Sequence, residues 1–427
     1  MKNTFIKATV ILMLGTMITK ILGFFIKIIF TRIIGEGIEI YSLIMPTYSL
    51  LIAITNLGLP YAISTIMARN NVRGIHIFSS IIPISLLFNI IIIGLLFLIA
   101  PTLANNLLNN KDAYYPILSI AFVLPFTTIS GIIKGYYFGK QKTLPNSISS
   151  ILEQITRFIL LILIIPPLTK KSIILAVSAY IIISGICEIV QIIVYLFFAP
   201  KNLHITLNDL KIKIPLMNEI LELSIPNVAG RLIGNISYFL EPILLTNILL
   251  FVGYSTKFII SEYAIYNAYV IPLLTMPSFI SLALNTTLIP EISKNYQNKT
   301  RVKNILTKCL KISFIIGIIF NILLFFKGDL FLNLIYNTNK GIDYLRVLSI
   351  FFPLFYLEGP LISALQGLNL SKFTMQVTLK GCILKNICII ILSLFSIGIY
   401  GLIISEIINI IYVLKTNYKK LRQLKYL

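Results

Sequence analysis

Long apolar runs separated by short polar connections dominate this sequence of 427 residues. About 20 predominantly apolar residues suffice for an α-helix to cross a bilayer. Twelve runs reach or approach that length: Ala8–Phe30, Ile40–Met67, Ile77–Ile99, Tyr114–Ile133, Ile148–Ile165, Ile173–Phe198, Leu223–Leu250, Tyr263–Ile289, Ile312–Phe326, Val347–Leu368, Met375–Ile397 and Ile399–Leu414. Because every backbone N–H and C=O group in hydrocarbon must be paired within its own segment, these runs predict helices. The short alternating segments of a membrane β-barrel are absent. We therefore predict an all-α integral membrane protein with about twelve transmembrane helices.

The composition supports the same fold class. Hydrophobic residues make up 57% of the chain and charged residues 12%, whereas a soluble domain carries about 25% charged residues. Soluble catalytic folds are therefore excluded. The first residues, with Lys2 and Lys7 before an apolar run, resemble a signal peptide. No small-residue cleavage site follows, so we expect an uncleaved first span.

The basic residues predict the orientation of the chain. There are 36 Lys and Arg against 15 Asp and Glu, a formal net charge of +21. In a soluble protein this excess would suggest nucleic acid, but cytoplasmic loops of membrane proteins concentrate Lys and Arg. With the N-terminus inside, more than twice as many basic residues fall in inner as in outer connections; the outer ones are Arg32, Lys111, Lys170, Lys171, Lys257, Lys327, Lys340 and Arg346. We predict a multi-pass cell-membrane protein with both termini in the cytoplasm and no nucleic-acid partner.

The two halves of the chain resemble one another. Ser130–Lys140 aligns with Ile362–Lys372, so that Gly135 meets Gly367, and Ile40–Pro46 is similar to Ile265–Pro272. Because six is an even number of spans, both halves of the chain would begin on the same side of the membrane. This predicts a parallel pseudo-repeat, which is typical of transporters. The expected parts are an N-terminal six-helix lobe (1–200), a cytoplasmic linker (201–218), a C-terminal six-helix lobe (219–414) and a basic cytoplasmic tail (415–427). The tail either contacts anionic lipid headgroups or is a solvated end.

Two lysines in the first run are the strongest site candidates. Lys20 and Lys27 are seven residues apart and share a helix face with Thr16 and Gly23. A charge deep in the bilayer usually faces protein or water and has a partner. The stripe predicts a cavity that binds an anionic headgroup, such as a lipid-linked pyrophosphate. Alternatively, Lys27 reaches the membrane interface.

Other charges within the runs are further candidates. Arg231 has Asn227 and Asn235 one turn to either side, and this stripe is a second predicted anion contact. Glu153 and Arg157 are four residues apart, an order that favours an intrahelical pair with a structural or a functional role.

Several of these charges lie beside prolines. Glu241 precedes Pro242, and Glu358 precedes Gly359 and Pro360, so that each could couple transport to a proton or cation or pair with an arginine. The remaining charged residues of the runs are Glu188, Glu406, Lys380 and Lys385. Prolines within the runs predict bent helices that let a lobe rock, or are simply tolerated in membranes: Pro46, Pro60, Pro226, Pro242, Pro272, Pro277, Pro353 and Pro360.

Four segments resemble the stage V sporulation protein B family: Thr19–Lys27, Ile40–Arg69, Gly131–Leu160 and Ala264–Ser293. That family is part of the multidrug/oligosaccharidyl-lipid/polysaccharide exporter superfamily. The resemblance implies two six-helix lobes with alternating access for a lipid-linked cell-wall or polysaccharide precursor. Lys20 matches a basic residue that precedes an I/V-L-G-F run in related lipid II flippases, and Lys27 matches a basic position of the sporulation branch.

The sequence departs from the family pattern in two respects. Lysines stand where relatives often have arginine, which keeps the charge but loses bidentate phosphate recognition. The chain has twelve predicted spans, whereas relatives usually have fourteen, and the missing pair forms a lipid-tail groove in the flippases.

These features predict a flippase that moves a lipid-linked oligosaccharide or peptidoglycan precursor, for spore cortex or cell-wall polysaccharide, between leaflets by alternating access. The alternative is an ion-coupled multidrug or cation antiporter of the same superfamily, although a cationic cleft would repel cationic drugs. No nucleotide-binding loop occurs, so we expect an ion gradient or the membrane potential to drive transport. We expect no enzyme activity, because the acids of the short outer loops form no catalytic motif: Glu36, Glu39, Asp112, Asp329 and Asp343. The cysteines and histidines lack disulfide or zinc spacing, so we expect no cofactor or metal. Membrane lipids are the other expected partner, and a monomer is the expected state.

Overall fold

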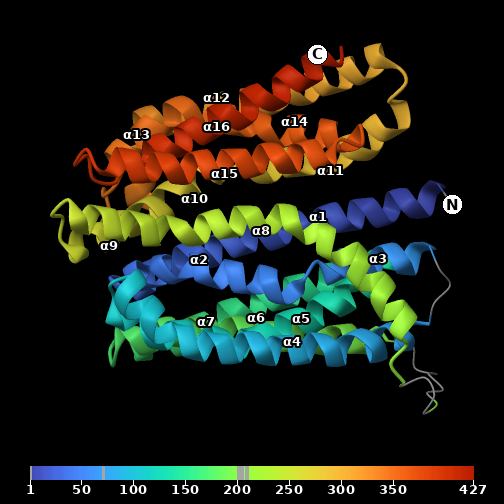
Figure 1. Ribbon diagram of the computed structural model, residues 1–427, viewed down its shortest axis with the longest axis horizontal. Coiled ribbons are helices and arrows are strands. Elements are labelled where there is room, and N and C mark those ends of the chain that lie inside the picture. The colour runs from blue at the N-terminus through green and yellow to red at the C-terminus, as the bar shows by residue number, and fades with distance from the viewer. Residues whose placement is uncertain (1, 70–72, 200–205, 207–210) are drawn as a thin grey trace. The chain divides into compact units, whose positions relative to one another are not determined.

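The computed structural model describes residues 2–69, 73–199, 206 and 211–427. Side chains at 2–14, 69, 225–227, 279–280, 282–283 and 286–287 are left out of that description. The described residues are helical and contain no strand (Figure 1). The α-helices are α1 (Lys2–Ile34), α2 (Gly37–Asn56), α3 (Leu59–Arg69), α4 (Gly74–Thr102), α5 (Tyr114–Gly139), α6 (Thr143–Thr169), α7 (Ile173–Phe197), α8 (Ile214–Phe251), α9 (Thr256–Ala264), α10 (Ile271–Thr275), α11 (Ser278–Asn295), α12 (Lys299–Tyr336), α13 (Ile342–Phe351), α14 (Phe355–Gly367), α15 (Ser371–Ser393) and α16 (Tyr400–Gln423).

Within the described residues, 10 helical segments are long and apolar enough to cross a membrane. This confirms the prediction of an all-α, multi-pass membrane protein. The first and last predicted spans, Ala8–Phe30 and Ile399–Leu414, lie in α1 and α16, which are not among those segments. The total of twelve spans therefore stays a prediction.

The chain divides into two compact units. Unit 1 is Met1–Asn235 and unit 2 is Ile236–Leu427, so that α8 contributes its first part to unit 1 and its second part to unit 2. Half of the predicted linker, 201–218, lies outside the described residues, and from Ile214 onward it is the start of α8. The predicted lobe boundaries stay a prediction.

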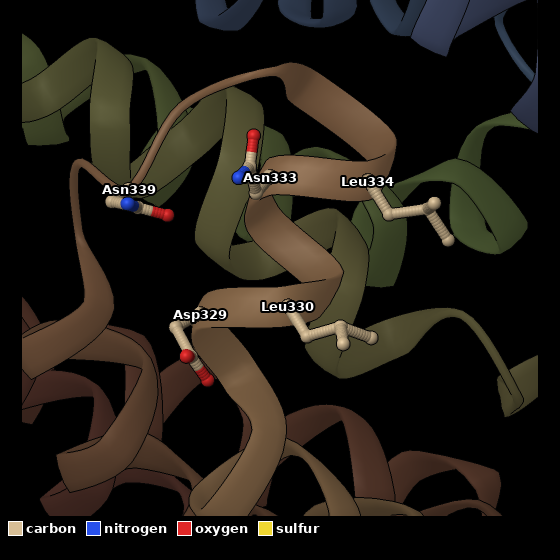
Figure 2. A pocket seen from close by; sticks show the side chains of 5 residues that line it. All are labelled: Asp329, Leu330, Asn333, Leu334 and Asn339. Carbon is tan, nitrogen blue, oxygen red and sulfur yellow. The ribbon is translucent and has the colours of Figure 1, made fainter.

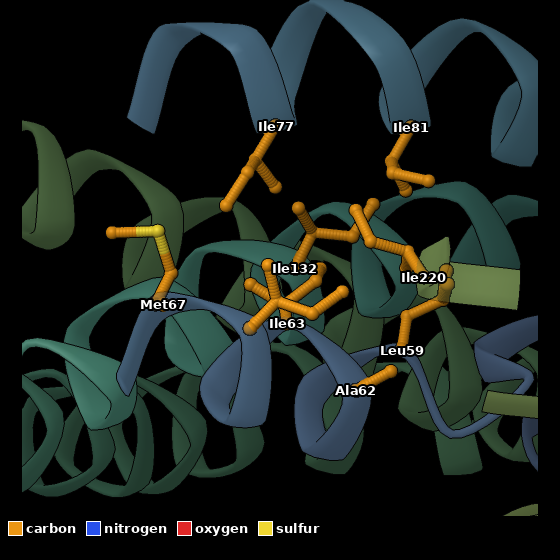
Figure 3. Packing of buried hydrophobic residues seen from close by; sticks show 9 residues of the cluster. Leu59, Ala62, Ile63, Met67, Ile77, Ile81, Ile132 and Ile220 are labelled. Atoms are coloured by element: carbon orange, nitrogen blue, oxygen red, sulfur yellow. The ribbon is translucent and has the colours of Figure 1, made fainter. Parts of the chain in front are cut away.

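A cluster of buried apolar side chains packs α3, α4, α5 and the first part of α8 together in unit 1. Figure 3 shows Ile77 and Ile81 of α4 pointing toward Ile63 and Ile132 of the helices below them. The cluster also contains Leu59, Ala62, Ile66, Met67 and Ile220. Burying apolar side chains away from water lowers the free energy of the folded state. Here this burial holds α3 against its neighbours.

The second predicted span is broken in the structure. The helix α2 ends at Asn56, and Leu57 and Gly58 adopt left-handed backbone conformations with φ of 44° and 65°. Pro60 then lies in the first turn of α3, where its missing N–H costs no helical hydrogen bond. The hydroxyl of Ser224 on α8 donates to the freed carbonyl oxygen of Leu57, which removes an unpaired acceptor from the apolar interior.

Six of the eight prolines predicted to bend helices divide into two groups; Pro272 lies in the first turn of α10, and the side chain of Pro226 lies outside the described residues. Pro60, Pro277 and Pro353 lie at breaks: Pro60 just after the α2–α3 break, Pro277 just before α11 begins, and Pro353 in the short 3-10 turn between α13 and α14. The helices α2, α8 and α14 continue through Pro46, Pro242 and Pro360. A membrane helix can thus contain proline without ending there.

A close glycine contact joins one pair of helices in each unit. In unit 1, a Cβ atom on Gly135 of α5 would lie 2.6 Å from the carbonyl oxygen of Pro60 on α3. In unit 2, a Cβ atom on Gly367 of α14 would lie 2.9 Å from the carbonyl oxygen of Ile289 on α11. Small residues let backbones approach in this way in membrane proteins. The glycines therefore set the spacing of α3 on α5 and of α11 on α14.

The basic end of the chain is helical and packs against other helices of unit 2. The helix α16 continues to Gln423, and Leu421 and Tyr426 are buried in a cluster with residues of α11, α12 and α14. The hydroxyl of Tyr426 donates to the carbonyl oxygen of Tyr296 at 2.7 Å. The Nζ atom of Lys299 lies 5.7 Å from the centre of the Tyr426 ring. The last residues thus pack against α11, α12 and α14 of unit 2.

Candidate functional site

The stripe of lysines on α1 lies beside the face that packs on α6. Gly15 and Gly23 of α1 face α6, where a Cβ on Gly23 would meet the side chain of Gln154. Lys20 is exposed and Lys27 is partly buried. Within the described part of the chain neither lysine forms an ion pair. The role of the two lysines in binding an anionic headgroup stays a prediction.

The second predicted stripe belongs to the part of α8 in unit 1. Arg231 is exposed, and the side-chain amide of Asn235 donates to the Arg231 carbonyl oxygen at 2.9 Å. The Asn235 side chain is thus bonded to its own helix, which leaves its amide oxygen as the open polar atom. The side chain of Asn227 lies outside the described residues.

A polar network lies among the helices of unit 1. Arg157 Nη2 lies 2.6 Å from Glu153 Oε1, one turn away on α6. Arg157 Nη1 also donates to Ser184 Oγ of α7 at 3.0 Å. Gln191 of α7 donates to the other oxygen of Glu153 at 3.2 Å. The charges are thus paired on one helix and bonded to the next, an arrangement suited to structural support.

One charged partner of this network was not singled out by sequence reasoning. The carboxylate of Glu188 on α7 accepts a hydrogen bond from the hydroxyl of Ser130 on α5. Both residues interrupt apolar runs, which is the only signal in the sequence. Glu188 thus adds a second acid to this interior beside Glu153, and Arg157 and Lys134 are both close enough to interact with it electrostatically.

Unit 2 contains a second network, and it is centred on Lys385 of α15. Lys385 Nζ lies 2.5 Å from Glu241 Oε1 of α8 and also forms an ion pair with Glu406 Oε2 of α16. Lys385 is 8% exposed and Glu241 is 4% exposed. The expected arginine partner of Glu241 is thus a lysine. Because a buried charge is tolerated only when it is paired, the network holds three helices together.

Glu358 has a different environment from Glu241. Its Oε1 atom is buried and has no hydrogen-bond partner among the described residues, and no described arginine pairs with it. The next residue, Gly359, lies against Asn285 of α11, so that a Cβ there would be 2.1 Å from the amide nitrogen. In unit 1, Gly131 lies against Asn56 in the same way, and a Cβ on Gly131 would be 3.0 Å from the amide oxygen of Asn56. The side-chain oxygens of both asparagines are buried and unpaired within the described chain.

The two cavities with defined linings lie in unit 2 and do not contain the predicted site residues. One, of about 490 Å³, is lined by Asp329, Leu330, Asn333, Leu334 and Asn339. Figure 2 shows Asp329 and Asn333 on one side of α12 and Leu330 and Leu334 on the other. The second, of about 470 Å³, is lined by Glu262, Lys340, Asp343, Tyr344, Tyr400 and neighbours. No group of metal-ligating side chains occurs among the described residues.

Comparisons with known proteins agree on one family. A family model described as polysaccharide biosynthesis protein matches residues 5–296. Stage V sporulation protein B of Bacillus subtilis (strain 168) is 32% identical over 415 residues, which cover 94% of this chain and 80% of that protein. Lipid II flippase MurJ of the same organism is 27% identical over 176 residues, or 38% of this chain and 32% of that protein.

Solved structures share the fold. An inward-facing multidrug resistance MATE family transporter of the MOP superfamily superimposes with a TM-score of 0.76 at 15% identity, over 95% of this chain and 94% of that one. Lipid II flippase MurJ in an inward closed conformation gives a TM-score of 0.72 at 14% identity, over 98% of this chain and 89% of that one.

The molecule is therefore a multi-pass helical membrane protein with the fold that these two structures share. The chain belongs to the polysaccharide biosynthesis protein family. The resemblance to stage V sporulation protein B noted in the sequence is confirmed.

Proposed function

We propose that this protein is a flippase that moves a lipid-linked oligosaccharide or peptidoglycan precursor between the leaflets of the cell membrane by alternating access. The observation that carries the proposal is the contrast between charges: Lys20, Lys27 and Arg231 have no ion-pair partner among the described residues, whereas Arg157 and Lys385 do. Unpaired cations in a membrane protein indicate a water-filled path or an anionic ligand. A pyrophosphate-linked saccharide has the required charge.

The family supports this substrate class. The related proteins carry the names stage V sporulation protein B, sporulation protein YkvU and lipid II flippase MurJ. A lipid-linked precursor of the spore cortex or of another cell-wall polysaccharide is accordingly the proposed cargo. The protein would act as a transporter rather than as an enzyme, as a monomer, with both termini in the cytoplasm.

We also propose two six-helix lobes related by a parallel pseudo-repeat. The matched contacts of Asn56 with Gly131 and of Asn285 with Gly359 support this relation, because the two pairs are separated by nearly the same number of residues. The break between α2 and α3 and the break between α10 and α11 are a second shared feature. Lobes that keep such internal contacts could move as bodies while helix ends adjust.

The proposal is tested by replacing Lys20 and measuring flipping of a fluorescent lipid-linked disaccharide pyrophosphate in vesicles. Loss of a charge-assisted contact reduces the rate by about 10- to 100-fold, so Lys20→Ala and Lys20→Glu should show this loss and Lys20→Arg should retain most activity. Lys170→Ala, at an exposed helix end, is the matched control. Normal flipping by Lys20→Glu would contradict the proposed anion site.

A multidrug or cation antiporter is the second candidate. The TM-score of 0.76 to a MATE family transporter favours it by fold, and the acid-rich networks of both units could serve cation coupling. The unpaired basic residues argue against a cationic cargo. Proton-driven efflux of a cationic dye from vesicles that contain this protein, combined with no flipping of the lipid precursor, would select this candidate.

A further inference from the structure

A cavity of about 470 Å³ in unit 2 lies where the ends of several helices meet. It is lined by Glu262 near the end of α9, Lys340 between α12 and α13, and Tyr400 at the start of α16. Asp343 and Tyr344 in the first turn of α13 also line it. The volume is in the range of small-ligand sites, which combine apolar surface with a few polar groups. The lysine stripe and the ion-pair networks described above include none of these residues.

Two tyrosine rings supply apolar surface to this cavity. Tyr344 and Tyr400 meet edge to face with their ring centres 5.2 Å apart, and both side chains are partly buried. The Tyr344 hydroxyl donates to Oε2 of Glu262 on α9, which leaves the other carboxylate oxygen of Glu262 as an acceptor. An aromatic ring presents an apolar face beside a polar edge. A sugar ring is complementary to it, because it has an apolar C–H face and hydroxyl groups on its rim.

Charged groups of both signs also line the cavity. Lys340 and Asp343 are exposed, and neither forms an ion pair with a described residue. An ammonium group offers three hydrogen-bond donors and a carboxylate only accepts, so donors and acceptors occur together here. The lysine opposes the binding of a cation, and the two acids oppose the binding of an anion. The lining therefore favours an uncharged ligand that carries many hydroxyl groups.

The backbone around Lys340 holds one side of the cavity in place. Gly341 has a left-handed backbone conformation with φ of 86°, and a Cβ there would lie 2.5 Å from Cγ2 of Ile265 in η4 (Ile265–Val270). Only glycine allows this approach of the connection to η4 without strain. The N–H of Lys340 donates to Oγ1 of Thr338 at 3.2 Å. A site that is already formed loses less conformational entropy when a ligand binds.

The same connection lines the other cavity of unit 2. Asn339 lines that cavity together with Asp329 and Asn333 of α12 (Figure 2). The next residue, Lys340, lines the first cavity. Amide and carboxylate side chains are hydrogen-bond partners for hydroxyl groups. Because adjacent residues line the two cavities, a ligand of more than one sugar ring could contact both.

We propose that these cavities form a saccharide-binding site, in which a sugar ring packs on Tyr400 and its hydroxyl groups bond to Glu262, Lys340 and Asp343. The assignment rests on the proposed flippase function, because it gives this site the sugar part of the cargo. In the predicted orientation, Lys340 belongs to an outer connection. The site would therefore hold the saccharide after it has crossed the membrane.

The test is binding of chitotriose, an uncharged trimer of N-acetylglucosamine, to the purified full chain in detergent micelles. Saturation-transfer NMR detects the binding, and calorimetric titration gives the Kd. Tyr400→Ala removes the ring and should weaken binding by about 10-fold. Lys340→Ala and Asp343→Asn each remove one hydrogen-bonding group and should weaken it by about 2- to 10-fold. Both of these side chains are exposed, so the two variants carry the test if Tyr400→Ala does not fold.

One variant and two competing ligands serve as controls. Tyr418→Ala replaces an exposed tyrosine toward the other end of α16 and should bind chitotriose like the natural protein. N-acetylglucosamine should displace chitotriose. Displacement by the ammonium sugar glucosamine but not by N-acetylglucosamine would identify a cation site and overturn the proposal. Displacement by inorganic phosphate would identify an anion site and overturn it as well.

Free and lipid-linked saccharides share this chemistry, and a second titration distinguishes them. The lipid-linked disaccharide pyrophosphate of the flipping assay is titrated into the protein in nanodiscs. If the sugar of the cargo is the ligand, Tyr400→Ala should weaken binding of both ligands by a similar factor. A loss for chitotriose alone would overturn the assignment of the site to the cargo.

The absence of chitotriose binding to the natural protein would overturn the proposal. The same Kd in the natural protein and in the three variants of the lining would also overturn it. Neither titration measures transport. Normal chitotriose binding by a protein that does not flip the lipid precursor would therefore reject only the proposed flippase, and failed binding with normal flipping would reject only this site.

Discussion

The two units pair their buried charged side chains in different ways. Unit 1 places its base and one acid a single turn apart on α6, and Glu153 and Arg157 form their ion pair within that helix. Unit 2 places Glu241, Lys385 and Glu406 on three helices, so that the ion pairs form only when those helices pack. A pair within one helix stays intact if neighbouring helices shift, whereas a three-helix bridge resists such a shift. The difference indicates that α8, α15 and α16 behave as one body within unit 2.

The neutral contacts beside these charges are alike in the two units. An asparagine lies against a glycine in each, Asn56 against Gly131 and Asn285 against Gly359. The residue before the glycine differs: Ser130 bonds to Glu188, whereas Glu358 has an oxygen with no partner in the described chain. The asparagine–glycine contact is thus alike in the two units, whereas the residue before the glycine is a neutral serine in one and a glutamate in the other. Substitutions in one unit therefore have a natural counterpart in the other.

Within unit 1, the largest effect is expected for Arg157→Ala, and the loss should be smaller than that of Lys385→Ala in unit 2. Removing one partner of a buried ion pair leaves an uncompensated charge and costs about 3–5 kcal/mol. Gln191 still bonds to Glu153, so we expect the lower end of that range. The double variant Arg157→Ala with Glu153→Gln should recover most of the loss. Chemical denaturation in detergent micelles measures both variants.

This prediction also tests the comparison of the two units. Glu153 keeps neutral hydrogen-bond donors after the arginine is lost, whereas the unit 2 acids depend on Lys385. A loss for Arg157→Ala that exceeds the loss for Lys385→Ala would contradict this ranking. It would mean that Glu188 depends on Arg157 more than on Ser130.

The sequence predicted those features that depend on one helix and not those that depend on packing. Helical class and membrane insertion follow from apolar runs, and the pair of Glu153 and Arg157 follows from four-residue spacing. Glu241 and Lys385 were both recognised as charges within apolar runs. Their contact spans 144 positions, and no periodicity connects residues on different helices. The partner of Glu241 was therefore expected to be an arginine and is a lysine.

The positions where helices break also could not be predicted from the sequence alone. Proline marks where a helix can end, but Pro46, Pro242 and Pro360 lie within continuous helices and Pro60 lies next to a break. What differs at Pro60 is the pair of left-handed residues before it and the Ser224 hydroxyl that donates to Leu57. That hydrogen bond comes from a helix far away in the sequence. The first and last membrane spans, and the anion-binding role of Lys20, Lys27 and Arg231, stay predictions.

An intermediate loss of stability is expected for Gly135→Ala. The loss should be larger than that of Gly359→Ala. The new methyl group at Gly135 would lie 2.6 Å from the backbone oxygen of Pro60, and backbone cannot move without separating α3 from α5. Overpacking of this kind costs about 1–3 kcal/mol. At Gly359 the obstacle is the side-chain amide of Asn285, which can rotate away, so we expect a smaller loss. Denaturation of the two variants under the same conditions compares them.

Gly94→Ala is the control for both glycine variants. A Cβ at Gly94 of α4 would meet nothing within 4 Å, and alanine favours the helix relative to glycine. The variant should be as stable as the natural protein or slightly more stable. Equal losses for Gly135→Ala and Gly359→Ala would mean that the two helix pairs tolerate extra volume alike, against the distinction drawn here.

The smallest effect is expected for Tyr426→Phe at the basic end of unit 2. The substitution removes the hydroxyl that donates to the Tyr296 carbonyl oxygen and leaves the buried ring in place. One such hydrogen bond contributes about 0.5–1.5 kcal/mol. Hydrogen exchange of the amides in the last turn of α16 should accelerate by about 2- to 10-fold, because local opening follows the lost free energy. Tyr418→Phe, whose side chain is exposed, should leave that exchange unchanged. Unaltered exchange in Tyr426→Phe would mean that the apolar contacts of Leu421 and the Tyr426 ring hold this end of the chain without the hydrogen bond.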